Sequence, residues 1–174
     1  DRAPVDLLSL SGHKFHAPKG VGVLFVRRGV RIKPLIHGGG QEEGLRGGTE
    51  NVASIAGLAK ACELVGKGLD GMAGRIASLR DALENGIVKK IPCARIHGAK
   101  APRSPNTASI SFRGLEAEAL LTALSDEGIC ASSGSACKKG ITEPSHVLVA
   151  MGLPKDYALC TLRFSFGHGN TPGD

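Results

Sequence analysis

The spacing of hydrophobic and polar positions changes twice along this chain, and each change predicts a different secondary structure. Residues 5–10 form a short, mostly apolar run and residues 21–26 a second one rich in β-branched residues, with glycine and proline between them. Both runs predict strands. From residue 52 to residue 90 apolar residues recur at helical spacing, and residues 94–96 and 107–112 alternate again like strands.

The helical region carries two sets of apolar residues that are expected to pack inward. The sets are Val52, Ile55, Ala56, Ala59 and Cys62, and then Met72, Ile76, Leu79, Leu83 and Ile87. Gly66 and Gly68 are expected to interrupt or end the helix between these sets. Thr49 or Asn51 is placed to cap its start.

The last third of the chain predicts a compact α+β lobe. A helix is expected from Leu115 to Glu127, with Gly128 as its C-terminal stop. A short helix should follow, capped by Thr142 with Pro144 in its first turn, and its inward residues should be Val147, Ala150 and Met151. Residues 161–166 then predict a closing strand.

Composition narrows the class of protein. Of 174 residues, 41% are hydrophobic and 22% charged, as in soluble globular proteins, and no apolar run approaches a membrane span. The net charge of +6 is scattered without a long basic run, which argues against nucleic-acid binding. The five cysteines form no CxxC pair, so neither a disulfide framework nor a metal site is expected, and a reducing cytoplasm fits best.

The segment between the first two predicted strands carries candidate chemistry. Ser11, His13 and Lys14 place a hydroxyl, an imidazole and an amine within four residues. Such a group can bind a phosphate and offer Lys14 as a covalent attachment point for a carbonyl compound. From spacing alone an ordinary basic turn remains the other interpretation, and Lys19 is the alternative lysine.

Two further segments are rich in small residues. Residues 38–48 contain many glycines but fit neither a Walker loop nor a dinucleotide fingerprint. They can let the backbone pass close to a ligand or a partner subunit, or form a plain surface loop. Residues 128–140 surround Cys137 with Ser, Gly and Ala, which suits a mobile loop. Lys138 and Lys139 beside it could favour the thiolate.

Taken together, five motifs in order resemble the cysteine desulfurases, which are pyridoxal-phosphate enzymes of the class V aminotransferase group. The motifs are Ser11-Gly-His-Lys followed by Pro18-Lys-Gly, His37-Gly-Gly-Gly, Arg46-Gly-Gly-Thr-Glu-Asn51, Ser132-Ser-Gly-Ser-Ala-Cys137 and Arg163-Phe-Ser-Phe-Gly167. They span nearly the whole chain, and the match is best to the nitrogenase-maturation branch.

The resemblance implies an α/β fold of pyridoxal-phosphate fold type I, present here in part. Residues 1–68 would be the end of the large-domain sheet, residues 69–90 a linking helix, and residues 91–174 the small α+β C-terminal domain that carries the Cys137 loop. We expect the chain to be the C-terminal half of such an enzyme. We also expect this half to be inactive by itself, because Asp6 does not match the family's acid on the pyridine nitrogen.

The resemblance also implies residue roles. Lys14 would hold the aldehyde of pyridoxal 5'-phosphate, with Ser11, Gly12 and His13 around the cofactor. Thr49 would reach the cofactor phosphate of the other subunit in a homodimer. Arg163 would pair with the carboxylate of L-cysteine, and Cys137 would take the sulfur as a persulfide and release L-alanine.

The implied partner is a sulfur-acceptor or iron–sulfur scaffold protein that uses the sulfur for cluster assembly. The lysines after Cys137 depart from the Thr or Ser that is common there in the family. Two alternatives stay open. One is a non-catalytic dimerisation or sulfur-acceptor module, and the other is a related selenocysteine lyase or sulfinate-desulfinating enzyme.

Overall fold

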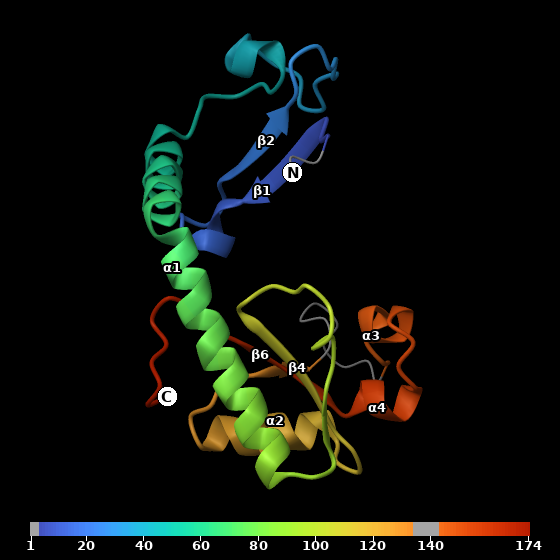
Figure 1. Ribbon diagram of the computed structural model, residues 1–174. Coiled ribbons are helices and arrows are strands. Elements are labelled where there is room, and N and C mark those ends of the chain that lie inside the picture. The colour runs from blue at the N-terminus through green and yellow to red at the C-terminus, as the bar shows by residue number, and fades with distance from the viewer. Residues whose placement is uncertain (1–3, 134–142) are drawn as a thin grey trace. The chain divides into compact units, whose positions relative to one another are not determined.

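The computed structural model describes residues 4–133 and 143–174 (Figure 1). The chain divides into two compact units, residues 1–69 and residues 70–174. The first unit contains β1 (Leu7–Ser11), η1 (Gly12–Phe15), β2 (Gly22–Val26), η2 (Gln41–Gly44) and the start of α1 (Val52–Lys90). The second contains the rest of α1 and β3 (Ala94–Ile96), β4 (Thr107–Phe112), α2 (Ala117–Asp126), β5 (Ser132–Ser133), α3 (His146–Ala150), α4 (Lys155–Leu159) and β6 (Thr161–Ser165).

In the first unit the two predicted strands pair as an antiparallel hairpin (Figure 1). Leu7 lies opposite Val26 and Ser11 opposite Gly22. Beyond the strand ends, the Arg27 amide donates to the Asp6 carbonyl at 2.9 Å, and their side chains form an ion pair. The hairpin register therefore places Ser11, the last residue of β1, at the entrance to the predicted functional turn.

The first part of α1 packs on that turn through a different face from the predicted one. Leu58 and Ala61 are buried with Ala17. Val52 is 70% exposed, and Ile55 and Cys62 are also exposed, so the predicted inward set was wrong. Small apolar residues occur on several sides of this stretch of helix, so the helical period of 3.6 residues fits more than one possible buried face.

Helix α1 runs without a break through Gly66 and Gly68, so the predicted interruption was also wrong. Each glycine costs about 1 kcal/mol relative to alanine inside a helix, which weakens the helix without forcing it to stop. The second predicted set does pack inward: Ile76 is buried, and Leu83 and Ile87 contact the core of the second unit.

That core lies on one face of an antiparallel sheet with the strand order β3-β4-β6-β5. Strands β3 and β4 have the bounds predicted from alternation, and β6 ends one residue before the prediction. The buried residues of the apolar face and of α2 are Ala108, Ile110, Phe112, Leu162 and Ala117. Side chains of α1 and α2 cover this face, and for α1 the pattern of Ile76, Leu83 and Ile87 predicted it.

The opposite face of the sheet is polar. Cross-strand pairing places Ser111 beside Thr161 and Ser109 beside Arg163, with the hydroxyls and the guanidinium on one face. Helix α4 lies against the Ser111–Thr161 end, where both hydroxyls donate to the Tyr157 carbonyl at 3.1 and 2.7 Å. The polar face thereby carries the Arg163 side chain predicted to bind a substrate.

Helix α3 differs from its prediction. It begins at His146, so Pro144 precedes the helix instead of occupying its first turn. Leu148 is its buried residue, whereas Val147 and Met151 are about half exposed. Thr142 lies outside the described residues.

Candidate functional site

The turn from Ser11 to Lys14 is built around Gly12. The Gly12 amide donates to the Val21 carbonyl at 3.0 Å, and the Gly12 carbonyl accepts the Ala17 amide at 3.1 Å. A Cβ on Gly12 would lie 2.9 Å from the Val21 oxygen and 3.1 Å from Leu58 Cδ1. Glycine is therefore required for α1 to pack this closely on the turn.

The side chains that flank Gly12 point to solvent-accessible space. Ser11, His13 and Lys14 are exposed, and the part of the chain that the structure describes provides no hydrogen bond or ion pair to their side-chain atoms. A hydroxyl and an imidazole are donors to a phosphate, and a primary amine condenses with an aldehyde. This donor set fits pyridoxal phosphate. Lys19 is also exposed, so exposure alone does not separate the two lysines.

Residues 36–48 form a tightly closed glycine loop. The Gly47 amide donates to the Ile36 carbonyl at 2.9 Å, and a Cβ on Gly47 would lie 2.7 Å from Gly38 Cα. The Gly48 amide donates to Gln41 Oε1 at 3.2 Å. Side chains other than hydrogen could not fit where the two backbone segments cross.

Thr49 follows this loop directly and is exposed. The cap of α1 is Asn51, whose Oδ1 accepts the Ser54 amide at 3.2 Å. The Thr49 hydroxyl is therefore not used as the helix cap.

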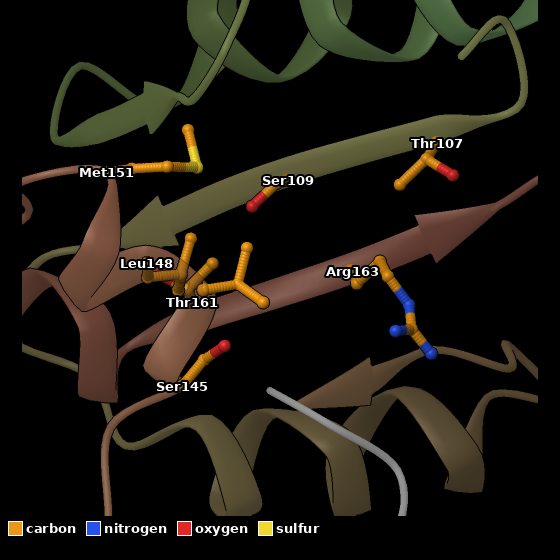
Figure 2. Close-up of a pocket in the computed structure, with 8 residues that line it drawn as sticks. Thr107, Ser109, Ser145, Leu148, Met151, Thr161 and Arg163 are labelled. Carbon is orange, nitrogen blue, oxygen red and sulfur yellow. The ribbon is translucent and has the colours of Figure 1, made fainter. Parts of the chain in front are cut away.

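In the second unit, Arg163 lines a cavity of about 230 Å³ on the polar face of the sheet (Figure 2). The other lining residues are Thr107, Ser109, Ser145, Val147, Leu148, Met151 and Thr161. Arg163 lies opposite Ser109 on β4 and opposite Ser132 on β5. Three adjacent strands thus hold two hydroxyls beside one guanidinium.

The Arg163 side chain keeps a donor available. Its Nε is buried and has no hydrogen-bond partner among the described residues. A buried donor left unpaired costs about 1–3 kcal/mol, so a ligand oxygen that accepts from it gains that much. A carboxylate is the acceptor that matches a planar guanidinium.

Cys137, the predicted sulfur carrier, lies within residues 134–142, outside the described part of the chain. Four other cysteines can be placed. Cys62, Cys93 and Cys130 are exposed. Cys160 is buried and donates its S–H to the Tyr157 carbonyl at 3.3 Å, which makes it a structural thiol.

The sequence did not predict one cluster of polar groups on the polar face of the sheet. His97 is buried, and its Nε2 hydrogen-bonds to Ser111 Oγ. The Ser111 and Thr161 hydroxyls, which both contact the Tyr157 carbonyl, also contact each other, with 2.8 Å between Ser111 Oγ and Thr161 Oγ1. His97, Ser111 and Thr161 thus form a continuous polar chain that ends at the Tyr157 carbonyl.

The surroundings of His97 lower its pKa below the ordinary value, first through burial and second through the positive charge of Arg95. The β3–β4 register pairs Arg95 with Ser111, so the two residues lie on one face of the sheet. The contact with Tyr157 joins residues far apart in the chain, so no local pattern could have predicted it.

Within the described ranges, no group of three His, Cys, Asp or Glu residues is arranged to hold a metal ion. In the same ranges no helix is long and apolar enough to cross a membrane.

A comparison with known protein families identifies the family of this chain. The model for class-V aminotransferases covers residues 1–174. The chain therefore belongs to the class-V aminotransferase family. Among curated proteins it is similar to the cysteine desulfurase of Gluconacetobacter diazotrophicus, with 52% identity over 170 residues, 98% of this chain and 42% of the relative. The cysteine desulfurase of Trichormus azollae is 52% identical over 161 residues, 92% of this chain and 40% of the relative.

Solved structures give the same fold. A NifS-like protein is 40% identical with a TM-score of 0.86, over 98% of this chain and 43% of that protein. The NifS-like protein from Rickettsia africae is 35% identical with a TM-score of 0.86, over 97% of this chain and 44% of that protein. The expected resemblance and the partial α/β fold are confirmed. The chain spans about two-fifths of the length of the curated relatives named here.

Proposed function

We propose that the natural protein carrying this chain is a pyridoxal-phosphate-dependent cysteine desulfurase that converts L-cysteine to L-alanine. The names of the curated relatives support this reaction. The observation that carries it within the chain is Arg163, whose buried Nε is an unused donor beside a cavity of about 230 Å³. Arg163 would bind the carboxylate of L-cysteine and orient its sulfur.

The cofactor residues belong to the first unit. The Lys14 amine would hold the aldehyde, with Ser11 and His13 donating to the phosphate and Gly12 leaving room for the backbone. Thr49, exposed after the glycine loop, would serve the phosphate in the other subunit of a homodimer. When bound, pyridoxal phosphate supplies the electron sink that lets the carbon–sulfur bond break.

Cys137 would receive the sulfur. Its thiolate attacks the sulfur of the bound cysteine, a sulfur–sulfur bond forms, and the carbon–sulfur bond breaks with its electron pair going to the carbon side. A proton replaces the sulfur there, for which the Lys14 amine is the carrier. One thiol and one cysteine thus give one persulfide and one alanine. The persulfide would pass to a cytoplasmic acceptor protein for iron–sulfur cluster assembly.

The test is steady-state alanine production from L-cysteine by the natural full-length protein with pyridoxal phosphate. Arg163→Lys keeps the charge but loses the planar fork, and KM for L-cysteine should rise about tenfold or more. Cys137→Ser should retain cofactor binding and lose the persulfide seen by mass spectrometry. As a matched control, Lys89→Gln at the exposed end of α1 should leave the KM for L-cysteine and the persulfide unchanged. A persulfide on Cys130 in the Cys137→Ser variant, or an unchanged KM in Arg163→Lys, contradicts the proposal.

A further inference from the structure

Tyr157 of α4 has two guanidinium groups close to its ring. The Cζ of Arg95 lies 5.4 Å from the ring centroid, and the Cζ of Arg113 lies 5.8 Å from it. Both distances fall within the range of cation–π attraction. The three residues come from β3, from the position just after β4, and from α4, so the fold brings them together.

The backbone of Tyr157 is held in place by the sheet. The Tyr157 carbonyl accepts hydrogen bonds from the Ser111 and Thr161 hydroxyls. Arg95 lies directly opposite Ser111 in the β3–β4 register. The Tyr157 backbone and the Arg95 strand position are therefore fixed through the same buried serine.

The two positive charges are not balanced within the described residues. Arg95 and Arg113 are exposed, and no carboxylate in the described part lies within 4.0 Å of either. By contrast, Arg80 and Arg103 of the same unit each pair with an acidic side chain. Cation–π attraction leaves the charge of the guanidinium in place, so this surface keeps a positive potential.

We propose that Arg95, Arg113 and Tyr157, the arginine–tyrosine surface, bind an acidic segment of a partner protein. Arginine and tyrosine, with tryptophan, are enriched among the residues that contribute most to binding at protein interfaces. Guanidinium groups bind side-chain carboxylates through paired hydrogen bonds. The cavity beside Arg163 includes none of the three residues, so this surface is not part of the lining of the proposed substrate pocket. Binding here requires neither cofactor nor turnover.

The pKa of His97 should report binding at this surface. The groups that face its ring network are Arg95 on β3, Ser111 on β4, Thr161 on β6 and the Tyr157 carbonyl on α4. Burial lowers the pKa of His97, and Arg95, the charged group among these, lowers it further. Carboxylates bound to Arg95 would offset that charge, so the pKa of His97 should rise when an acidic segment binds.

The test uses a short fluorescein-labelled peptide of alternating Glu and Gly, with a Gln–Gly peptide as its uncharged match. Fluorescence anisotropy should detect binding of the Glu peptide alone, weakening as salt is added. The double variant Arg95→Gln/Arg113→Gln should bind about tenfold more weakly or worse. The control Lys89→Gln/Lys90→Gln also removes two positive charges, from the end of α1, which packs on the opposite face, and should stay within about twofold of wild type.

Nuclear magnetic resonance of His97 supplies the second measurement. Saturating Glu peptide should raise the pKa of His97 in the wild type and leave it unchanged in Arg95→Gln. Equal weakening in Lys89→Gln/Lys90→Gln and in Arg95→Gln/Arg113→Gln would overturn the proposal, because the attraction would then be unspecific. Inorganic phosphate that displaces the peptide at matched ionic strength and raises the same pKa would also overturn it in favour of a small-anion site. Thermal melts confirm that each variant is folded, and Arg95→Lys/Arg113→Lys should keep part of the affinity.

Discussion

Glu84 of α1 and Arg103 of the β3–β4 connection form a bidentate ion pair with nitrogen–oxygen distances of 2.7 and 2.6 Å. The Glu84 side chain is only 5% exposed, whereas that of Arg103 is 20% exposed. Arg80 adds bonds from the same helix to the carbonyls of Ser104 and Pro105 at 3.1 and 3.3 Å. Together these contacts fix the proline-rich connection to α1.

Replacing Arg103 with Ala should destabilise the second unit, because Glu84 would keep its charge in a buried position without a partner. The expected loss is about 3 kcal/mol in the free energy of unfolding. Urea unfolding followed by circular dichroism measures it. The control is Lys60→Ala, which breaks an exposed pair with Glu63 and should leave the midpoint nearly unchanged. Equal effects of the two variants would show that burial of Glu84 does not matter.

Gly12→Ala should destabilise the first unit. The added methyl would lie 2.9 Å from the Val21 oxygen and 3.0 Å from Ala17 Cβ, and such overpacking costs about 1–3 kcal/mol. Gly66→Ala is the matched change on the exposed side of α1, where no atom lies within 4 Å of the new Cβ. It should stabilise the helix by about 1 kcal/mol. A neutral Gly12→Ala would mean that α1 does not press on the turn that carries Lys14.

The stability of the second unit should depend on pH through His97. Burial and the charge of Arg95 lower the pKa of His97 in the folded chain below its ordinary 6.5. The unfolded chain then takes up this proton at a higher pH than the folded chain. The stability that neutral His97 contributes to the folded second unit is therefore fully present above the ordinary pKa. It is lost as the pH falls through the lowered pKa of the folded chain.

Urea unfolding at several pH values between about 7 and 5 should show this loss in the wild type. His97→Gln keeps an amide N–H for Ser111 but cannot be protonated, so its unfolding free energy should change less over the same range. An identical pH dependence in both proteins would assign the effect to another group.

The sequence predicted β1, β2, β3, β4, β6 and the second half of α1 because their patterns are local and strong. It missed β5, whose two serines were assigned to the loop around Cys137. Alternation defined β3 and β4, and the spacing of Ile76, Leu83 and Ile87 defined the face that meets the sheet. The first half of α1 was assigned the wrong face because Ala, Gly and Val surround it on several sides. A period alone could not tell Leu58 from Ile55.

The features of the candidate site also divide into those that local motifs predicted and those that required the structure. Motif order identified Lys14, Thr49, Arg163 and Cys137 as candidates, since each belongs to a short segment with its own chemistry. The buried Nε of Arg163 and the contacts of Tyr157 with Arg95 and Arg113 depend on strand register and helix packing. Those relations join residues that are distant in the chain, so they needed the structure.

The most direct test of the central claim is to find which lysine holds the cofactor. The natural full-length protein would be equilibrated with pyridoxal phosphate, reduced with borohydride, digested and mapped by mass spectrometry. The account predicts a reduced pyridoxyl label on Lys14, lost in Lys14→Ala and retained in Lys19→Ala. A label on Lys19, or no labelled lysine in this chain, would contradict it.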